Sequence, residues 1–138
     1  MSDERDGEYS RTRSLQKRWA EEDAAREKRQ EREKELFLEE QANEVFAPID
    51  ECLTRVDKVL RGFGASIDYD RTWKHLGDQR LRRSATVKSA QPDRELRLGF
   101  TIEGRRIFYR EECYQSSRET QALIRILVRE IEHFLEPR

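Results

Sequence analysis

Glu130 and His133 are three residues apart in a segment with helical periodicity, so both side chains are expected on one face of a helix. An E-x-x-H pair of this kind is half of the carboxylate-bridged di-iron site found in helix bundles. The other half requires a second such pair, and His75 is the only other histidine in the sequence. We therefore expect no metal site, and we interpret the two residues as a surface pair near a helix C-terminus, where a cationic histidine is favoured.

Asp68 and Asp70 alternate along a predicted strand, where two carboxylates could bind a divalent cation or act as an acid and a base. Alternating aspartates are also ordinary on an exposed strand, and an enzyme would need both of them to converge with His75 in a concave site. Cys52 falls on an apolar helical stripe, and Cys113 has no evident His or Asn partner. The sequence thus predicts no catalytic residue and no cofactor.

Charged residues make up 41% of the chain and are distributed unevenly. Residues 1–50 contain 15 acidic and 10 basic side chains, whereas residues 71–110 contain 11 basic and 4 acidic ones. The net charge of −1 conceals this difference. A local basic patch can still attract an anion, because physiological salt screens charges only beyond roughly 8 Å.

Residues 15–40 are rich in Ala, Glu, Arg, Lys and Gln and contain no Gly or Pro, which predicts a helix. Opposite charges at three- and four-residue spacing support it. Apolar residues are sparse for a coiled coil, so a solvated helix is the alternative interpretation. Leu15 and Trp19 are one turn apart and are the predicted docking residues. We expect residues 1–41 to be a charged helical arm, partly disordered over residues 1–12.

Residues 42–138 have the periodic pattern of a folded domain. Apolar residues recur at helical spacing from 45 to 63, with Pro48 at a kink or in the first turn. Between residues 65 and 111, four segments typical of strands are separated by short turns.

The last part of the chain predicts a second helix. Ser116 and Glu119 have the spacing of a capping box, and a wide apolar stripe continues from there to Glu136. The expected fold class is α+β: a long charged N-terminal helix leads into a two-layer domain. In that domain a four-stranded antiparallel meander packs against a helix from each end.

Residues 96–110 predict a hairpin whose type II′ turn has Gly104 and Arg105 as its central residues. Alternate side chains then face opposite sides of the sheet. Those facing the core are Leu96, Leu98, Phe100, Ile102, Ile107 and Tyr109. Those on the other side are Arg97, Gly99, Thr101, Glu103, Arg106, Phe108 and Arg110. Thr86 and Lys88 extend this side on the preceding strand, with Arg82 as a further candidate.

The candidate basic face consists of Arg97, Arg106, Phe108, Arg110 and Lys88. Basic side chains neutralise phosphates and an aromatic ring can stack on a base, so this combination is similar to that of nucleic-acid-binding sheets. Three other interpretations stay open. The face is the solvated back of an antiparallel sheet, an interface for an acidic protein, or a surface for the chain's own acidic arm.

These observations favour a non-catalytic interaction or adaptor module that acts through its helical arm and exposed sheet face. A protein partner or self-association as a dimer is expected, and a nucleic-acid-binding protein is the alternative. The two isolated cysteines and the absence of a secretory signal favour the cytoplasm. No apolar run approaches the roughly 18 residues of a membrane span, so no membrane partner is expected.

Overall fold

A computed structural model describes residues 2–90 and 93–136, with side chains from residue 13 onward in those ranges. The chain separates into two compact units, residues 1–37 and residues 38–138. The partial disorder expected over residues 1–12 stays a prediction, because only the backbone of residues 2–12 is described.

Helix α1 (Ser2–Arg61) forms the first unit and contributes its C-terminal part to the second, which confirms the helix expected over residues 15–40. Pro48 lies inside α1, so it does not mark a first turn. There it removes one backbone donor from the helix. The helix ends before Gly64, whose φ of +78° suits a residue without a Cβ atom.

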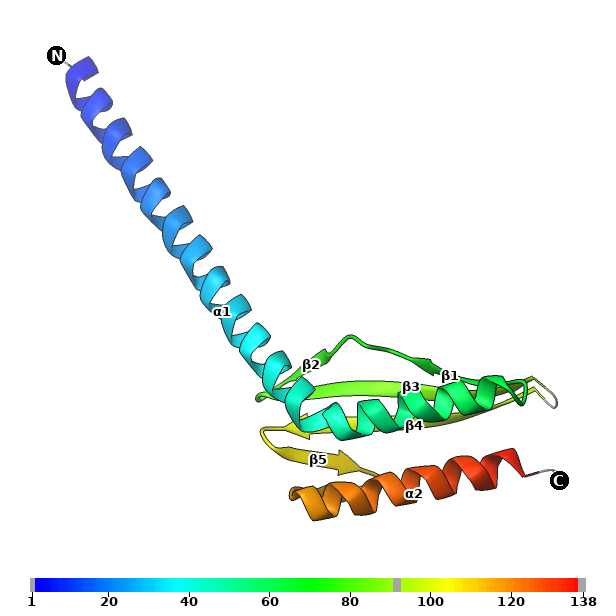
Figure 1. Cartoon of the computed structure of the whole chain (residues 1–138). Helices are drawn as coiled ribbons and strands as arrows, with labels where there is room; N and C mark the ends of the chain where they lie inside the picture. Colours follow the sequence, from blue (N-terminus) through cyan, green and yellow to red (C-terminus); the bar gives the residue numbers. More distant parts are fainter. Residues whose placement is uncertain (1, 91–92, 137–138) are drawn as a thin grey trace. The chain divides into compact units, whose positions relative to one another are not determined.

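The second unit contains an antiparallel sheet of six strands within the described residues (Figure 1). The strands are β1 (Ala65–Tyr69), β2 (Lys74–Gly77), β3 (Arg80–Ala90), β4 (Asp93–Glu103), β5 (Arg106–Tyr109) and β6 (Glu112–Tyr114). Their order is β1-β3-β4-β5-β6, and β2 also pairs with β3. β1 pairs with the second half of β3 and β2 pairs with its first half.

The expected number of four strands was too low for two local reasons. The first expected strand is interrupted between Tyr69 and Lys74, which divides it into β1 and β2. The last one turns at Arg110 and Glu111, both with positive φ, and returns as β6. The α+β class itself is confirmed, because the added strands extend the same antiparallel sheet.

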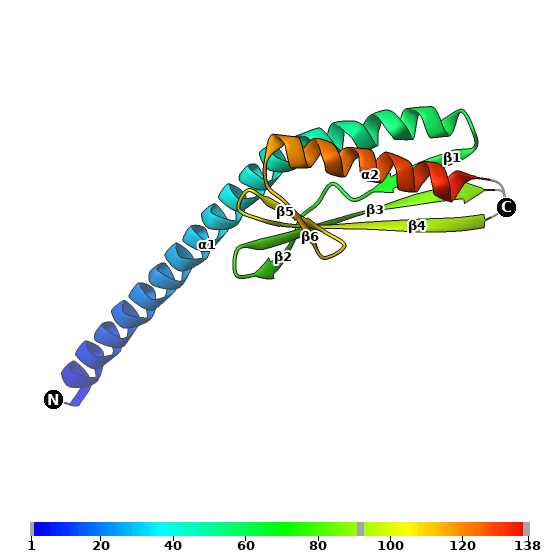
Figure 2. The same cartoon turned by 90° about the horizontal axis from the view of Figure 1, so that it is seen from below.

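Helix α2 (Ser117–Leu135) begins with the expected capping box. The Ser116 hydroxyl accepts a hydrogen bond from the Glu119 amide, and the Glu119 carboxylate accepts one from the Gln115 amide. In Figure 2, α2 and the C-terminal part of α1 lie on one side of the sheet, which gives the predicted two layers. None of the helices in the described part of the chain is long and apolar enough to cross a membrane.

The core lies between these two layers and is centred on aromatic rings. Phe46 of α1 and Phe100 of β4 are fully buried, with ring centroids 5.1 Å apart. Phe100 also stacks on Tyr109 of β5 at 5.3 Å. Around them pack the buried aliphatic side chains of both helices and the sheet, including Ile49, Leu53, Val87, Leu98, Ile102, Ile107, Leu123, Leu127 and Ile131.

Candidate functional site

The hairpin register is confirmed, since Glu103 pairs with Arg106 and Thr101 pairs with Phe108. Alternation therefore leaves one side of the sheet directed away from the helices, and we call this side the outer face. On β3 it consists of Arg80, Arg82, Ser84, Thr86 and Lys88, and on β4 and β5 of Glu95, Arg97, Gly99, Thr101, Glu103, Arg106 and Phe108. Neither α2 nor the part of α1 that belongs to the second unit covers this side in Figure 2.

Acidic side chains lie at both ends of the outer face. At one end Glu103 is paired in register with Arg80 on one side and Arg106 on the other. At the other end Lys88 opposes Glu95 and forms an ion pair with Asp68, with the Nζ and Oδ2 atoms 3.3 Å apart. Arg106 and Lys88, two of the predicted basic residues, therefore have acidic neighbours.

Between these ends lies a patch without a carboxylate, which we call the central patch. It consists of Arg82, Ser84, Arg97, Gly99, Thr101 and Phe108. A Cβ atom built on Gly99 would lie 3.3 Å from Nη2 of Arg82, so the guanidinium group extends over the glycine. Within the described residues, neither Arg82 nor Arg97 forms an ion pair.

The expected position of Arg110 was wrong. This residue lies in the turn between β5 and β6 with a φ of 48°, and its Nη1 atom is 3.0 Å from Oε1 of Glu130 on α2. Because α2 packs on the side opposite the outer face, this ion pair directs Arg110 away from Arg97. The positive φ ends the strand alternation on which the prediction rested. Phe108 does lie on the outer face, half-buried beside Thr101.

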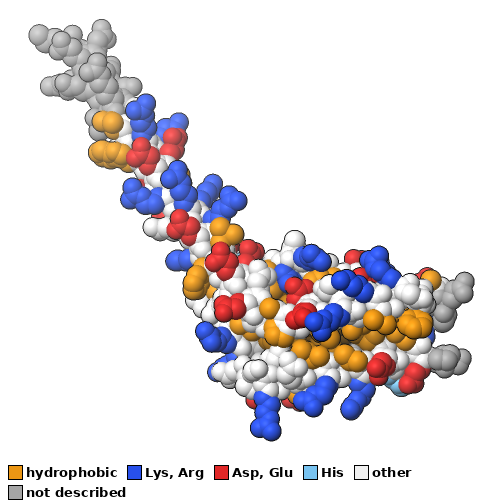
Figure 3. Space-filling view, in the orientation of Figure 1, with side chains coloured by type: hydrophobic (Ala, Val, Ile, Leu, Met, Phe, Trp, Pro, Cys, Tyr) orange, Lys and Arg blue, Asp and Glu red, His pale blue; other side chains and the backbone are white. Residues whose placement is uncertain are grey.

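Leu15 and Trp19, the predicted docking residues of the arm, are exposed at 49% and 61%. Every described side chain from residue 13 to residue 37 is exposed. Leu36 and Phe37 are two further exposed apolar residues, at 49% and 66%. Figure 3 shows few hydrophobic side chains among interspersed basic and acidic ones along the helix.

The residues considered for catalysis are held by separate partners. Asp68 pairs with Lys88, Asp70 accepts hydrogen bonds from the amide and hydroxyl of Thr72, and His75 Nε2 is 3.1 Å from a Glu39 carboxylate oxygen.

Glu130 and His133, the E-x-x-H pair, also have separate partners. The hydroxyl of Tyr109 donates to Glu130, while His133 lies near Glu136. Among the described residues, no group of three or more His, Cys, Asp and Glu side chains could hold a metal ion.

Arg83 is a buried cation that the sequence analysis did not single out. It is 5% exposed on the helix side of β3, and its guanidinium carbon lies 3.8 Å from the ring centroid of Trp73. The rings of Phe46 and Tyr69 are also within 5.6 Å. The available signal was strand alternation, because Arg83 shares the inward positions of Ala85 and Val87.

Hydrogen bonds from Arg83 join three parts of the domain. Its guanidinium group donates to the Tyr69 hydroxyl, to the Arg71 backbone carbonyl and to Oδ1 of Asn43. Burial raises the pKa of Tyr69 to about 12, so this hydroxyl remains neutral at physiological pH. The arrangement fixes the chain between β1 and β2 over the aromatic core.

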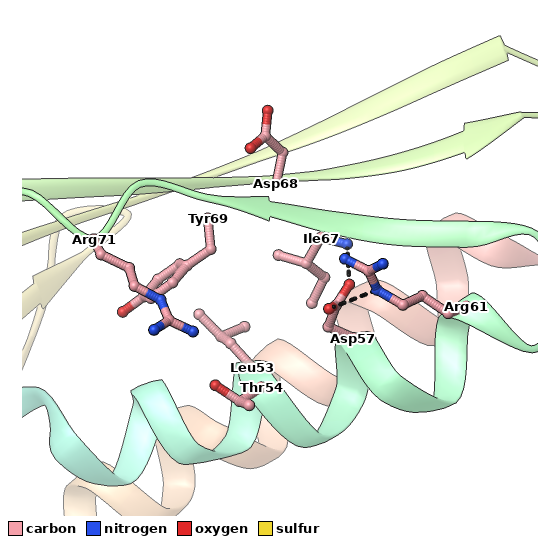
Figure 4. Close-up of a pocket in the computed structure, with 8 residues that line it drawn as sticks. All are labelled: Leu53, Thr54, Asp57, Arg61, Ile67, Asp68, Tyr69 and Arg71. Carbon is pink, nitrogen blue, oxygen red and sulfur yellow. Dashed lines mark hydrogen bonds and ion pairs between the residues drawn. The ribbon is translucent and has the colours of Figure 1, made fainter.

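A small cavity of about 270 Å³ lies between α1 and β1 (Figure 4). Its lining includes Asp57, whose carboxylate accepts hydrogen bonds from the Ile67 amide at 2.8 Å and from Nε of Arg61 at 3.0 Å. The bond from the Ile67 amide holds the pKa of Asp57 below its ordinary value of 3.8, and Arg61 lowers it further. Because β1 is an edge strand, no neighbouring strand accepts a hydrogen bond from the Ile67 amide, and the Asp57 carboxylate accepts it instead.

Replacing Asp57 with Asn is expected to lower the free energy of unfolding by about 1 to 2 kcal/mol near neutral pH. The folded-state pKa is depressed, so the carboxylate stabilises the fold above its unfolded-state pKa and loses this effect as the pH falls through the folded-state value. Urea unfolding of both proteins from neutral pH down to about pH 3 should show their difference shrinking with acidity. Asp68→Asn, in an exposed ion pair, is the control; a difference independent of pH would contradict the prediction.

The fold and its surfaces define a two-layer α+β domain that follows a helical segment without a core of its own. Comparison of the chain with protein-family models, curated proteins and solved structures finds no match.

Proposed function

We propose that the protein is a non-catalytic interaction module that acts through its helical arm and its outer face, and that it self-associates through the arm. The arm here means residues 1–37. The observation that carries the proposal is the exposure of Trp19 and Phe37 on a helical segment in which every described side chain is exposed. Large apolar side chains that face water in this way favour a partner.

Helical spacing places the two aromatic residues on one side of the arm. They are 18 residues apart, which corresponds to about five turns of an α-helix, and Leu15 lies one turn before Trp19. An antiparallel pair of arms would bring Trp19 of one copy against Phe37 of the other at both ends. This arrangement favours a second copy as the partner.

The charge of the arm is compatible with this pairing. Residues 1–37 contain 11 acidic and 10 basic side chains, so two arms would not repel each other strongly. The same near-neutrality makes the arm a weak partner for a basic surface. Apolar contact at the two ends would therefore provide the affinity, and the charged residues between them would keep the free helix soluble.

The test is the molar mass of the full chain in solution, measured by light scattering over a range of concentrations. The wild type is expected to be dimeric, and the Trp19→Ala/Phe37→Ala double variant is expected to be monomeric with an unchanged circular dichroism spectrum. Phe63→Ala is the matched control, because this ring is 81% exposed but lies in the other unit. A monomeric wild type, or a double variant that still dimerises, would refute self-association through the arm.

A further inference from the structure

We infer that the central patch binds single-stranded nucleic acid, with Arg82 and Arg97 contacting phosphates and Phe108 stacking on a base. The inference deepens the proposed function and rests on it, since it names the partner of the outer face. It differs from the sequence-based candidate in two ways. Arg110 is on the other side of the domain, and Arg82 of β3 replaces it as an arginine on the same face as Arg97 of β4.

The central patch has unpaired positive charge in the part of the chain that the structure describes. Arg82 and Arg97 have no ion pair within the described residues, whereas Lys88 is paired with Asp68 and Arg106 opposes Glu103. Lys74 adds a third cation, because it opposes Arg82 on β2 and shares its face. The central rows of β3 and β4 contain no carboxylate, and Asp68, which lies in the row of Arg97 on β1, is paired with Lys88.

The shape of the central patch depends on Gly99. Gly99 has no side chain, and the Arg82 guanidinium lies over the space that a Cβ atom would take. The glycine thus lets the Arg82 guanidinium extend across β4 toward the strand position of Arg97, so that one nucleic-acid backbone could contact both arginines. The hydroxyl groups of Ser84, Thr86 and Thr101 lie in the neighbouring positions of the same face and can donate to phosphate oxygens.

The aromatic ring of Phe108 provides a surface on which a base can stack. Phe108 pairs with Thr101, which in turn pairs with Arg82, so an aromatic ring and a cation are separated by one strand. Single-stranded nucleic acid exposes its bases to stacking on such rings, whereas a duplex hides them. The central patch lies on the face of a sheet and presents no helix or projecting ribbon that could enter a duplex groove.

A protein partner fits the central patch less well. The cores of protein interfaces contain several aromatic or aliphatic side chains, and Phe108 is the only large apolar side chain in the central patch. The chain's own arm is a poor competitor, because residues 1–37 are nearly neutral. The observations therefore favour a polyanion that also offers stacking surfaces.

The experiment measures binding of the full chain to fluorescently labelled uridine and thymidine dodecamers by anisotropy, at several salt concentrations. Arg82→Ala/Arg97→Ala is expected to bind at least about tenfold more weakly. The slope of log affinity against log salt should fall by about 0.7 for each lost phosphate contact. Phe108→Ala should weaken binding by roughly 5- to 150-fold, the range for one stacked base.

Arg125→Ala/Arg129→Ala is the matched control, because it removes the same charge from exposed positions of α2 on the other side of the domain. It should bind like the wild type. Absence of binding to both dodecamers, or equal weakening by the control, would overturn the inference. Equal affinity for a duplex of the same length would overturn it in favour of a general polyanion site, and equal affinity for polyglutamate would overturn it in favour of an acidic protein.

The Trp19→Ala/Phe37→Ala variant separates this inference from self-association through the arm. If that variant is monomeric and still binds the dodecamers, both proposals are supported independently. If it dimerises and binds them, self-association through the arm fails while the nucleic-acid site stands. If it is monomeric and Arg82→Ala/Arg97→Ala leaves dodecamer binding unchanged, the nucleic-acid site fails alone.

Discussion

Replacing Arg83 with Ala is expected to lower the free energy of unfolding of the domain by about 3 to 5 kcal/mol. The change opens a cavity among the rings of Phe46, Tyr69 and Trp73, which the guanidinium group now fills. It also leaves the Arg71 carbonyl without this donor, whereas Asn43 Oδ1 keeps a hydrogen bond from Nε1 of Trp73. A hydrogen bond from a charged donor contributes about 1.5 to 3 kcal/mol, so the loss exceeds that of an ordinary surface arginine.

Two variants separate packing from hydrogen bonding in a urea unfolding experiment. Arg83→Met fills much of the cavity but donates no hydrogen bond, so we expect an intermediate loss of about 1 to 3 kcal/mol. Arg80→Ala, an exposed arginine on the same strand, should change stability by less than about 0.5 kcal/mol. A methionine variant more stable than the wild type would show that the buried charge is a net cost, as occurs for some buried ion pairs.

Arg83 also shows which parts of the fold could be predicted from the sequence. Strand alternation is strict, so placing Ala85 and Val87 inward also places Arg83 inward. The partners of Arg83 could not be predicted, because Asn43 and Trp73 are brought to it by the packing of α1 and by the interruption between β1 and β2. Strand alternation predicts which side of the sheet a residue faces, whereas its contacts with distant segments depend on how the helices and strands pack.

The candidate basic face illustrates the same limit. The turn at Gly104 was predictable, because glycine suits its φ of +60°. The next turn places Arg110 and Glu111 at positive φ, and neither residue type favours that conformation. No sequence signal marked the end of β5, so Arg110 was assigned to the wrong side of the sheet.

The helices could be predicted more fully, because their sequence signals depend less on tertiary contacts. Apolar spacing and the capping box placed α2 almost to the residue, because both signals are local. The arm and the first core helix proved to be continuous as α1, with Pro48 inside it. Proline weakens a helix at one position, and packing of Phe46 and Ile49 on the sheet stabilises the helix on either side of it.

Replacing Phe100 with Ala is expected to cost about 3 to 5 kcal/mol, the range for a fully buried aromatic residue. Its ring contacts Phe46 of α1 and Tyr109 of β5, so the change loosens one helix and one strand together. A domain of this size is stable by only about 5 to 15 kcal/mol, so the variant should show a clearly lower urea midpoint.

Phe108→Ala is the natural comparison for Phe100→Ala, because it removes the same side chain from the outer face of the adjacent strand. We expect it to change stability by less than about 1 kcal/mol while weakening dodecamer binding. Phe100→Leu, which keeps most of the buried volume, should remain folded and bind the dodecamers like the wild type. The reverse pattern, with Phe108→Ala unfolding the domain, would mean that its ring serves packing and is not available to a base.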